Sequence, residues 1–151
     1  MRLSTRGRYA LRLMLDIALR PEEDSVSLKS VAQRQDISVK YLEQIAAPLV
    51  HGGLLRAIRG ARGGYQLCRM PEEYTVGLIL RTIEGSLSPV ACVEQGKMIC
   101  NRMDDCVTVE VYRRINDAID NVVDHITLRD LVELHREKQK KRESADASPE
   151  S

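Results

Sequence analysis

The stretch from Ser27 to Leu67 limits the fold of this chain more than any other, because two short helical patterns are followed at once by a glycine-rich hairpin. In the first part, apolar residues recur at helical spacing behind a serine that can cap a helix, and the pattern breaks at Asp36. A second helical pattern runs from Ser38 to the glycine pair Gly52 and Gly53. The sequence therefore predicts a helix, a tight turn and a second helix.

The second of these helices has two different faces. Its apolar residues Leu42, Ile45 and Leu49 recur at helical spacing and are expected to point inward. The residues that we expect to point outward, near its N-terminus, are Lys40, Tyr41, Glu43 and Gln44.

The hairpin that follows is basic at its tip. Apolar-alternating segments flank the turn Arg59-Gly60-Ala61-Arg62-Gly63-Gly64, in which glycines permit a tight turn. Helix, turn, helix and a basic-tipped hairpin are the outline of a winged helix. A helix of this kind fits the DNA major groove, and arginines can enter the narrower minor groove. We predict a mainly α fold with a small β-hairpin wing, in which a winged helix-turn-helix is joined to a long dimerisation helix.

Charge is distributed unevenly along the chain, although the net charge is only +1. Residues 1–70 carry 12 Lys and Arg against 6 Asp and Glu, whereas residues 71–151 carry 11 against 16. A phosphate-binding surface requires such a concentration of basic residues, and a solvated charged surface is the simpler alternative. Together with the order of the motifs, the charge favours DNA. No apolar run has the length of a membrane span, so we expect a cytoplasmic protein without a membrane partner.

The remaining segments extend this outline. A helix over residues 5–20 is expected to pack behind the two DNA-reading helices, and a helix capped by Thr75 should end at Gly85 with Leu78, Ile79 and Ile83 inward. We divide the chain into a winged helix (1–85), a loop without periodicity (86–105), two helices (106–142) and a disordered tail (143–151).

The helix expected over residues 106–126 repeats apolar residues at about 3.5-residue spacing, which is typical of a dimer seam. An ordinary amphipathic core helix is the alternative.

Three cysteines, Cys92, Cys100 and Cys106, lie in the loop and at its junction with the long helix, with the spacing Cys-x7-Cys-x5-Cys. Cytoplasmic proteins rarely contain structural disulfides, and the close Cys pairs of zinc sites are missing. The spacing favours an iron–sulfur cluster over zinc, with unligated cysteine as a third alternative. Cys68 stands apart and is expected to be a buried small residue.

Four segments, MRLSTRGRYALRLMLDIAL, ISVKYLEQI, RGARGGYQL and ITLRDLVEL, resemble the IscR-like winged-helix transcription regulators, and the similarity spans about residues 1–135. The resemblance implies a homodimer crossed through the long helix, an iron–sulfur cluster on the preceding loop, and DNA binding that changes with cluster state. It also implies a pseudo-palindromic operator in double-stranded DNA.

The resemblance assigns residues to DNA by position. Glu43 would discriminate bases, and a carboxylate can indeed accept from the cytosine amino group. Its implied neighbours in DNA binding are Ser38, Lys40, Tyr41 and Gln44 on the helix, with Arg59, Arg62, Gly63 and Gly64 in the wing.

Cys92, Cys100 and Cys106 match the family's three thiolate ligands, with two departures. The first spacing is seven residues where the best-known members have five, and Val109 stands where those members have a histidine ligand. Some nitric-oxide-sensing relatives use an aspartate in the first helix, where this chain has Arg8. The fourth ligand is therefore unassigned, with Glu94, Asp104, Asp105 and Glu110 as possible oxygen donors or a small thiol or water in their place. We favour a two-iron cluster and keep a four-iron cluster open, because three cysteines do not specify the type.

We therefore expect a homodimeric DNA-binding regulator of transcription, for instance a repressor, that senses cluster or redox status and controls iron–sulfur, iron or sulfur metabolism genes. An alternative is a winged-helix regulator that uses zinc, thiol oxidation or a partner protein. A small electron-transfer protein would leave the wing unexplained. The sequence has no nucleophile–base pairing or nucleotide-binding glycine loop, so we do not expect an enzyme.

Overall fold

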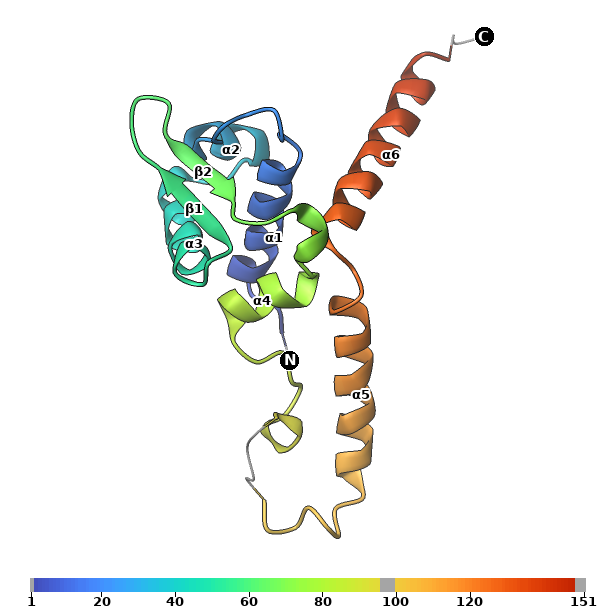
Figure 1. Ribbon diagram of the computed structural model, residues 1–151. Helices are drawn as coiled ribbons and strands as arrows, with labels where there is room; N and C mark the ends of the chain where they lie inside the picture. Colours follow the sequence, from blue (N-terminus) through green and yellow to red (C-terminus); the bar gives the residue numbers. More distant parts are fainter. Residues whose placement is uncertain (1, 96–99, 149–151) are drawn as a thin grey trace.

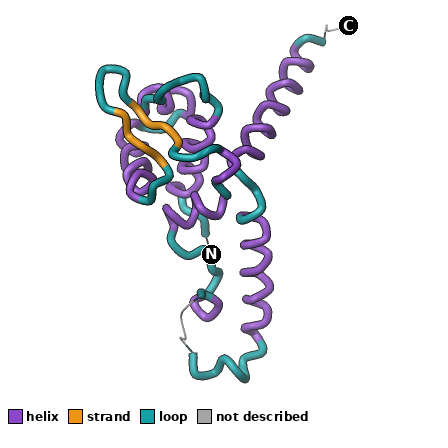
Figure 2. The backbone as a smooth tube through the Cα atoms, viewed as in Figure 1, coloured by secondary structure: helices purple, strands orange, loops and turns teal. Residues whose placement is uncertain are grey.

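The computed structural model describes residues 2–95 and 100–148 and shows the predicted mainly helical fold with one antiparallel hairpin (Figure 1; Figure 2). In chain order the elements are α1 (Thr5–Ala18), α2 (Leu28–Gln35), α3 (Val39–His51), β1 (Leu55–Ile58), β2 (Gly64–Leu67), η1 (Pro71–Glu73), α4 (Val76–Glu84), η2 (Ala91–Val93), α5 (Thr108–Val123) and α6 (Leu128–Asp146). None of the helices in the described ranges is both long and apolar enough to cross a bilayer.

The helix-turn-helix begins and ends at the predicted capping residues. Ser27 Oγ accepts a hydrogen bond from the Ser30 N–H at 3.2 Å, and Ser38 Oγ accepts one from the Tyr41 N–H at 3.1 Å. Between the helices, Asp36 adopts a left-handed conformation with φ of 54°, which asparagine and aspartate tolerate better than other non-glycine residues. These local interactions place α3 directly after α2, as predicted.

The core of the winged helix is aliphatic and is centred on α1. Leu13 and Met14 of α1 are fully buried, as are Leu42, Ile45 and Leu49 of α3. Helix α1 packs against α3, α4 and α6 and also touches α2, so it is the common support of the helix-turn-helix (Figure 1). The predicted inward face of α3 is therefore confirmed.

One carboxylate, that of Asp16, lies inside this core and is 1 % exposed. It accepts hydrogen bonds from Arg34 Nη2 at 2.6 Å, Gln35 Nε2 at 3.0 Å and Arg20 Nη1 at 3.1 Å. Burial raises the pKa of Asp16. The hydrogen bonds from Arg34 and Gln35 and the charges of Arg20 and Arg34 together lower it by more than burial raises it, so the pKa lies below its usual value. This carboxylate joins α1 to the C-terminal end of α2.

A buried tyrosine fixes the chain after the wing. The Tyr74 hydroxyl donates to the Leu54 carbonyl at 2.8 Å and accepts from the N–H groups of Cys68 and Arg69, both at 3.0 Å. Burial raises the pKa of Tyr74 above its usual value. Cys68 itself is exposed, so the expectation that it is buried is wrong: β2 ends at Leu67, and Tyr74 occupies the interior at this point.

Helix α4 has the predicted ends, with Thr75 as its N-cap and Gly85 as its C-cap. Of its apolar residues Ile79 is buried as predicted, Leu80 is buried although it was not predicted, and Leu78 and Ile83 are only partly buried. Gly77 is also buried, which brings α4 close to α5.

Helix α5 is shorter than the predicted helix over residues 106–126. At its C-terminal end the Ile126 carbonyl accepts from the Val76 N–H and the Leu128 N–H donates to the Tyr74 carbonyl, both at 2.9 Å. These bonds hold the connection to α6 in an extended conformation, which ends α5 at Val123.

Helix α6 is longer than expected and continues to Asp146, into the segment expected to be disordered. No glycine or proline interrupts residues 128–148, and Ser144 Oγ donates to the Lys140 carbonyl at 2.9 Å. Leu128 and Val132 are buried, whereas the later turns project away from the body (Figure 1). Residues 149–151 of that segment and residues 96–99 of the loop lie outside the described residues.

Candidate nucleic-acid interface and cysteine loop

Helix α3 displays polar side chains over its first two turns. Lys40, Glu43 and Gln44 are exposed, and across residues 2–95 and 100–148 neither Lys40 nor Glu43 takes part in an ion pair. Ser38 is exposed at the N-cap, where its hydroxyl already accepts the Tyr41 N–H. The helix therefore presents a donor, an acid and an amide that are free to contact base edges or phosphates.

Tyr41 differs from these neighbours because it is partly buried against α1. Its ring meets the Tyr9 ring edge to face, with centroids 5.7 Å apart and planes at 88°. The Arg12 guanidinium lies over the Tyr9 ring, 5.2 Å from its centroid, and Arg12 Nε also donates to Gln35 Oε1 at 3.0 Å. This aromatic contact, which sequence reasoning missed, fixes the first turn of α3 on α1.

The wing consists of β1 and β2 with an exposed turn between them. Register pairs Leu55 with Leu67 and Ile58 with Gly64, which leaves Arg59 and Arg62 exposed at the tip. The Ser25 hydroxyl donates to the Arg62 carbonyl at 2.7 Å and holds the tip against the start of the α2 segment. The two arginine side chains are therefore carried on a fixed backbone.

The two wing glycines are required by close backbone approach. A Cβ atom at Gly63 would lie 2.5 Å from the Ile58 carbonyl oxygen, and one at Gly64 would lie 2.4 Å from the Val26 carbonyl oxygen. Gly64 is adjacent to the bridge between Val26 and Tyr65 that docks the wing on the body. Only glycine, which has no Cβ atom, therefore fits at these two positions, and its small size allows the close packing that holds the wing in place.

The cysteine loop lies at the opposite end of the molecule from the wing (Figure 1). Cys92 is half-buried in η2, which packs against α5, while Cys100 is exposed and Cys106 lies two residues before Thr108, the first residue of α5. All three thiols are free. Among residues 2–95 and 100–148 the structure does not bring three or more cysteine, histidine or acidic side chains within the reach of a single metal ion.

Cys106 is the thiol best prepared to act as a thiolate. Its Sγ lies 3.3 Å from Thr108 Oγ1 at the N-terminus of α5. The Thr108 hydroxyl, followed by the N–H of Val109, lowers the pKa of Cys106 below its usual value. Because the thiolate is the form that binds metals, the Cys106 side chain is the one of the three that is best prepared to do so.

The side chains around Cys106 provide oxygen but no imidazole. Asp104, Asp105 and Glu110 line an open hollow of about 400 Å³ together with Cys106. Val109 is 2 % exposed, so the position at which the family resemblance implies a histidine is buried in this protein. Arg8 is exposed on α1, where its guanidinium donates to Thr5 Oγ1.

A helix-turn-helix with an exposed polar second helix and a basic, rigidly held wing defines the class of winged-helix DNA-binding regulators. The chain belongs to the Rrf2 family of iron-dependent transcriptional regulators, which it matches over residues 3–134. It is therefore a DNA-binding regulator of transcription.

Relatives and solved structures cover most of the chain. It is 42 % identical over 131 residues to the HTH-type transcriptional regulator CymR of Bacillus subtilis, covering 87 % of this chain and 89 % of CymR. It is 39 % identical over 132 residues to IscR of Pectobacterium atrosepticum, covering 87 % and 79 %. The solved structure of B. subtilis CymR, described as the global cysteine regulator, superposes with a TM-score of 0.74 at 40 % identity, over 89 % and 98 % of the two chains. The T. potens IscR structure gives a TM-score of 0.74 at 40 % identity over 92 % and 91 %.

Proposed function

We propose that this regulator acts in the cytoplasm as a homodimer whose binding to a pseudo-palindromic operator depends on an iron–sulfur cluster held by Cys92, Cys100 and Cys106. The observation that carries the proposal is the position of Cys106, a thiol prepared to ionise at the start of α5, in a loop with two further free cysteines. Three soft thiolate donors fit the chemistry of an iron–sulfur cluster, which when bound supplies sensitivity to oxidants and to iron supply. The genes that the regulator controls would be those of iron–sulfur, iron or sulfur metabolism.

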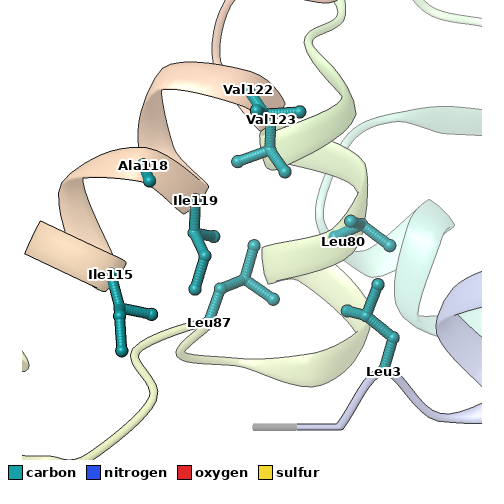
Figure 3. Close-up of a pocket in the computed structure, with 8 residues that line it drawn as sticks. All are labelled: Leu3, Leu80, Leu87, Ile115, Ala118, Ile119, Val122 and Val123. Carbon is teal, nitrogen blue, oxygen red and sulfur yellow. The ribbon is translucent and has the colours of Figure 1, made fainter. Parts of the chain in front are cut away.

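The apolar surface of α5 supports the homodimer. Val111, Ile115 and Val122 are exposed, which is unfavourable for a helix that faces water. Together with the winged helix, α5 forms an apolar groove of about 400 Å³ (Figure 3), lined by Leu3, Leu80, Leu87, Ile115, Ala118, Ile119, Val122 and Val123. We infer that α5 of a second copy covers this surface.

The dimer can be tested with two matched substitutions. Ile115 and Leu134 are similarly exposed, at 43 % and 48 %, but only Ile115 lies in the groove. Ile115→Asp should shift the sedimentation-velocity peak from dimer to monomer, whereas Leu134→Asp should leave the dimer intact. A monomeric wild-type protein, or an Ile115→Asp dimer as tight as wild type, would contradict the homodimer.

On the DNA side, we propose that Glu43 selects bases, with Ser38, Lys40, Tyr41 and Gln44 around it, and that Arg59 and Arg62 bind the minor groove beside the wing. The exposure of Lys40, Glu43 and Gln44 and of both arginines supports this assignment. Tyr41 would contribute by holding the first turn of α3 against Tyr9, and Gly63 and Gly64 would contribute by allowing the wing backbone to adopt its conformation.

The cluster can be tested by purifying the protein without oxygen and measuring the visible absorption spectrum, iron and acid-labile sulfide per chain. Sulfide equal to iron, lost on Cys92→Ala, Cys100→Ala or Cys106→Ala, is expected. Cys68→Ala is the matched control, because Cys68 is free and exposed but lies outside the loop. Iron without sulfide, or a cluster that survives the loss of Cys106, would contradict the proposed ligand set.

A regulator without a cluster is the second candidate, with zinc, thiol oxidation or a partner protein as the signal. It is favoured by the absence of a preformed metal-binding group among the described residues and by similarity to CymR, whose solved structure is described as a cysteine regulator. A colourless protein that binds DNA as a dimer would support it.

A further inference from the structure

Arg81 of α4 joins the winged helix to α5 through two carboxylates. Its Nη1 donates to Asp124 Oδ1 at 2.6 Å, and its Nη2 donates to Asp120 Oδ1 at 2.7 Å and to Asp124 Oδ2 at 3.1 Å. Asp120 and Asp124 are four residues apart and so share one face of α5. A planar guanidinium bonded to both carboxylates restrains the rotation of α5 and its position along its own axis.

The surrounding packing is built around this ion pair. A Cβ atom at Gly77, one turn before Arg81, would lie 2.1 Å from Asp124 Oδ1 and 2.6 Å from Arg81 Nη1. The Asn116 amide donates to Asp120 Oδ2 at 3.0 Å and orients that carboxylate. The close contact of α4 with α5 therefore depends on glycine at 77 and on the placement of these charges.

The cysteine loop borders the same ion pair. Ser86, Ser88 and Gln95 line a polar cavity of about 610 Å³ together with Arg81 and Asp120. Cys92 lies between the two loop segments that contribute these residues. A rearrangement of the loop would thus change the surroundings of this ion pair.

The ion pair is too exposed to be mainly a stabilising device. The side chains of Arg81, Asp120 and Asp124 are 37 %, 37 % and 38 % exposed, and exposed pairs add little to stability. Hydrogen bonds from Arg81 to two carboxylates raise its pKa, and an arginine guanidinium is charged at physiological pH even without such bonds. Its contribution is therefore geometric.

We propose that Arg81 is a positioning residue that sets the angle between the winged helix and α5, and with it the spacing of operator half-sites that the dimer accepts. This inference rests on the homodimer of the proposed function. In a dimer joined through α5, rotation of each winged helix about the Arg81 contact moves the two α3 helices relative to one another. Because half-sites must follow the helical repeat of DNA, a change in that separation alters which spacing is bound.

The experiment uses the full-length protein and half-sites found by selection from random duplexes. Fluorescence anisotropy then measures affinity for duplexes with the selected spacing and with one or two base pairs inserted or removed. Wild type should prefer one spacing by about tenfold or more, since a wrong spacing requires DNA to twist or bend. Arg81→Gln should reduce this preference to about threefold or less, with unchanged affinity for a single half-site.

Three further variants sharpen the test. Arg81→Lys should give an intermediate preference, because an ammonium is a single point charge and reaches one carboxylate. Gly77→Ala keeps every charge but displaces the Asp124 carboxylate, so it should lower or shift the spacing preference. Arg129→Gln is the control: it removes the 3.2 Å ion pair between Arg129 and Glu133 within α6 and should leave the spacing preference as in wild type.

The outcomes separate the inference from the proposal on which it rests. If wild type prefers one spacing and Arg81→Gln keeps the same preference, Arg81 does not set the spacing and the homodimer stands. If wild type binds all spacings equally, the result contradicts the proposal that a homodimer binds a pseudo-palindromic operator, and it contradicts the inference about Arg81 as well. If Arg81→Gln loses half-site binding, the spacing preference is measured instead on the double variant Asp120→Asn, Asp124→Asn, which changes α5 alone. A reduced preference in that variant supports the role of the Arg81 contact, and an unchanged preference contradicts it.

Discussion

The buried carboxylate of Asp16 offers the sharpest test of the physical account of the winged helix. The change Asp16→Asn keeps the size of the side chain and one oxygen acceptor but removes the negative charge. In the wild-type protein the charged carboxylate of Asp16 accepts hydrogen bonds from Arg34, Gln35 and Arg20 inside the core. The variant therefore removes the carboxylate that pairs with Arg34 and leaves Arg20 with Glu23 as its carboxylate partner, at 3.9 Å, while packing is preserved.

The size of the effect follows from the exposure of those partners. Breaking a fully buried ion pair costs about 3–5 kcal/mol. The side chains of Arg34 and Arg20 are 31 % and 23 % exposed, so water partly replaces the lost carboxylate. We expect a loss of about 2 kcal/mol in the free energy of unfolding, because the asparagine oxygen also retains one hydrogen bond. For a chain of this length that is a fall in Tm of about 4–8 °C.

The loss should also depend on pH in a defined direction. Because the folded state lowers the pKa of Asp16, its contribution is present above the unfolded pKa of about 3.9 and disappears as pH falls through the lower folded value. The difference in stability between wild type and Asp16→Asn should therefore be constant from about pH 5 to pH 7 and shrink below about pH 4.

Thermal unfolding followed by far-ultraviolet circular dichroism, on metal-free reduced protein at several pH values, measures both effects. Asp117→Asn is the matched control, since Asp117 is exposed on α5 and makes no ion pair in the described part of the chain. Equal Tm values for the two variants at neutral pH would refute the claim that Asp16 holds α1 to α2. A stability difference that persists undiminished well below pH 4 would refute the assigned charge state.

Three further predictions concern DNA and thiol chemistry. Glu43→Ala should relax discrimination at one base pair by about 1–3 kcal/mol, and unchanged relative affinities across a panel of operator variants would count against base selection by this carboxylate. Arg59→Ala should weaken binding to A·T-rich sites by about 1 kcal/mol or more, so an anisotropy titration identical to wild type would exclude the wing contact. In a chain with Cys106 as its sole cysteine, Thr108→Val should move the pH midpoint of iodoacetamide labelling upward, because the hydroxyl that favours the thiolate is gone. An unmoved midpoint would show that the helix N–H groups act alone.

Features set by neighbouring residues could be predicted from the sequence. The N-caps Ser27, Ser38 and Thr75 each bond the backbone three residues ahead, so a short segment contains all the necessary information. The glycine-tipped turn and the apolar face of α3 are local in the same sense. The winged helix-turn-helix and the family resemblance followed from these features.

Features set by distant residues could not be predicted. Asp16 interrupts the apolar face of the first helix, which signals a buried partner, but Arg34 is 18 residues away and nothing in the sequence selects it. Arg81 and Asp124 are 43 residues apart, and the Cys68 N–H is bonded by the hydroxyl of Tyr74, which lies beyond the end of the wing. The cysteine spacing named three candidate ligands, whereas the inward direction of Val109 emerged only from the packing of α5.

The paired bonds between residues 74–76 and 126–128 have a consequence for how such proteins can diversify. The chain leaves the winged helix after α4 and returns beside the point where α4 began, because Thr75 and Thr127 form a bridge. The chain between α4 and α6 thus starts at the end of α4 and finishes at a bridge to Thr75, the residue that caps the beginning of α4. We therefore expect a loop of another length to leave the fold of the helix-turn-helix unchanged, because the bridge fixes where the chain returns.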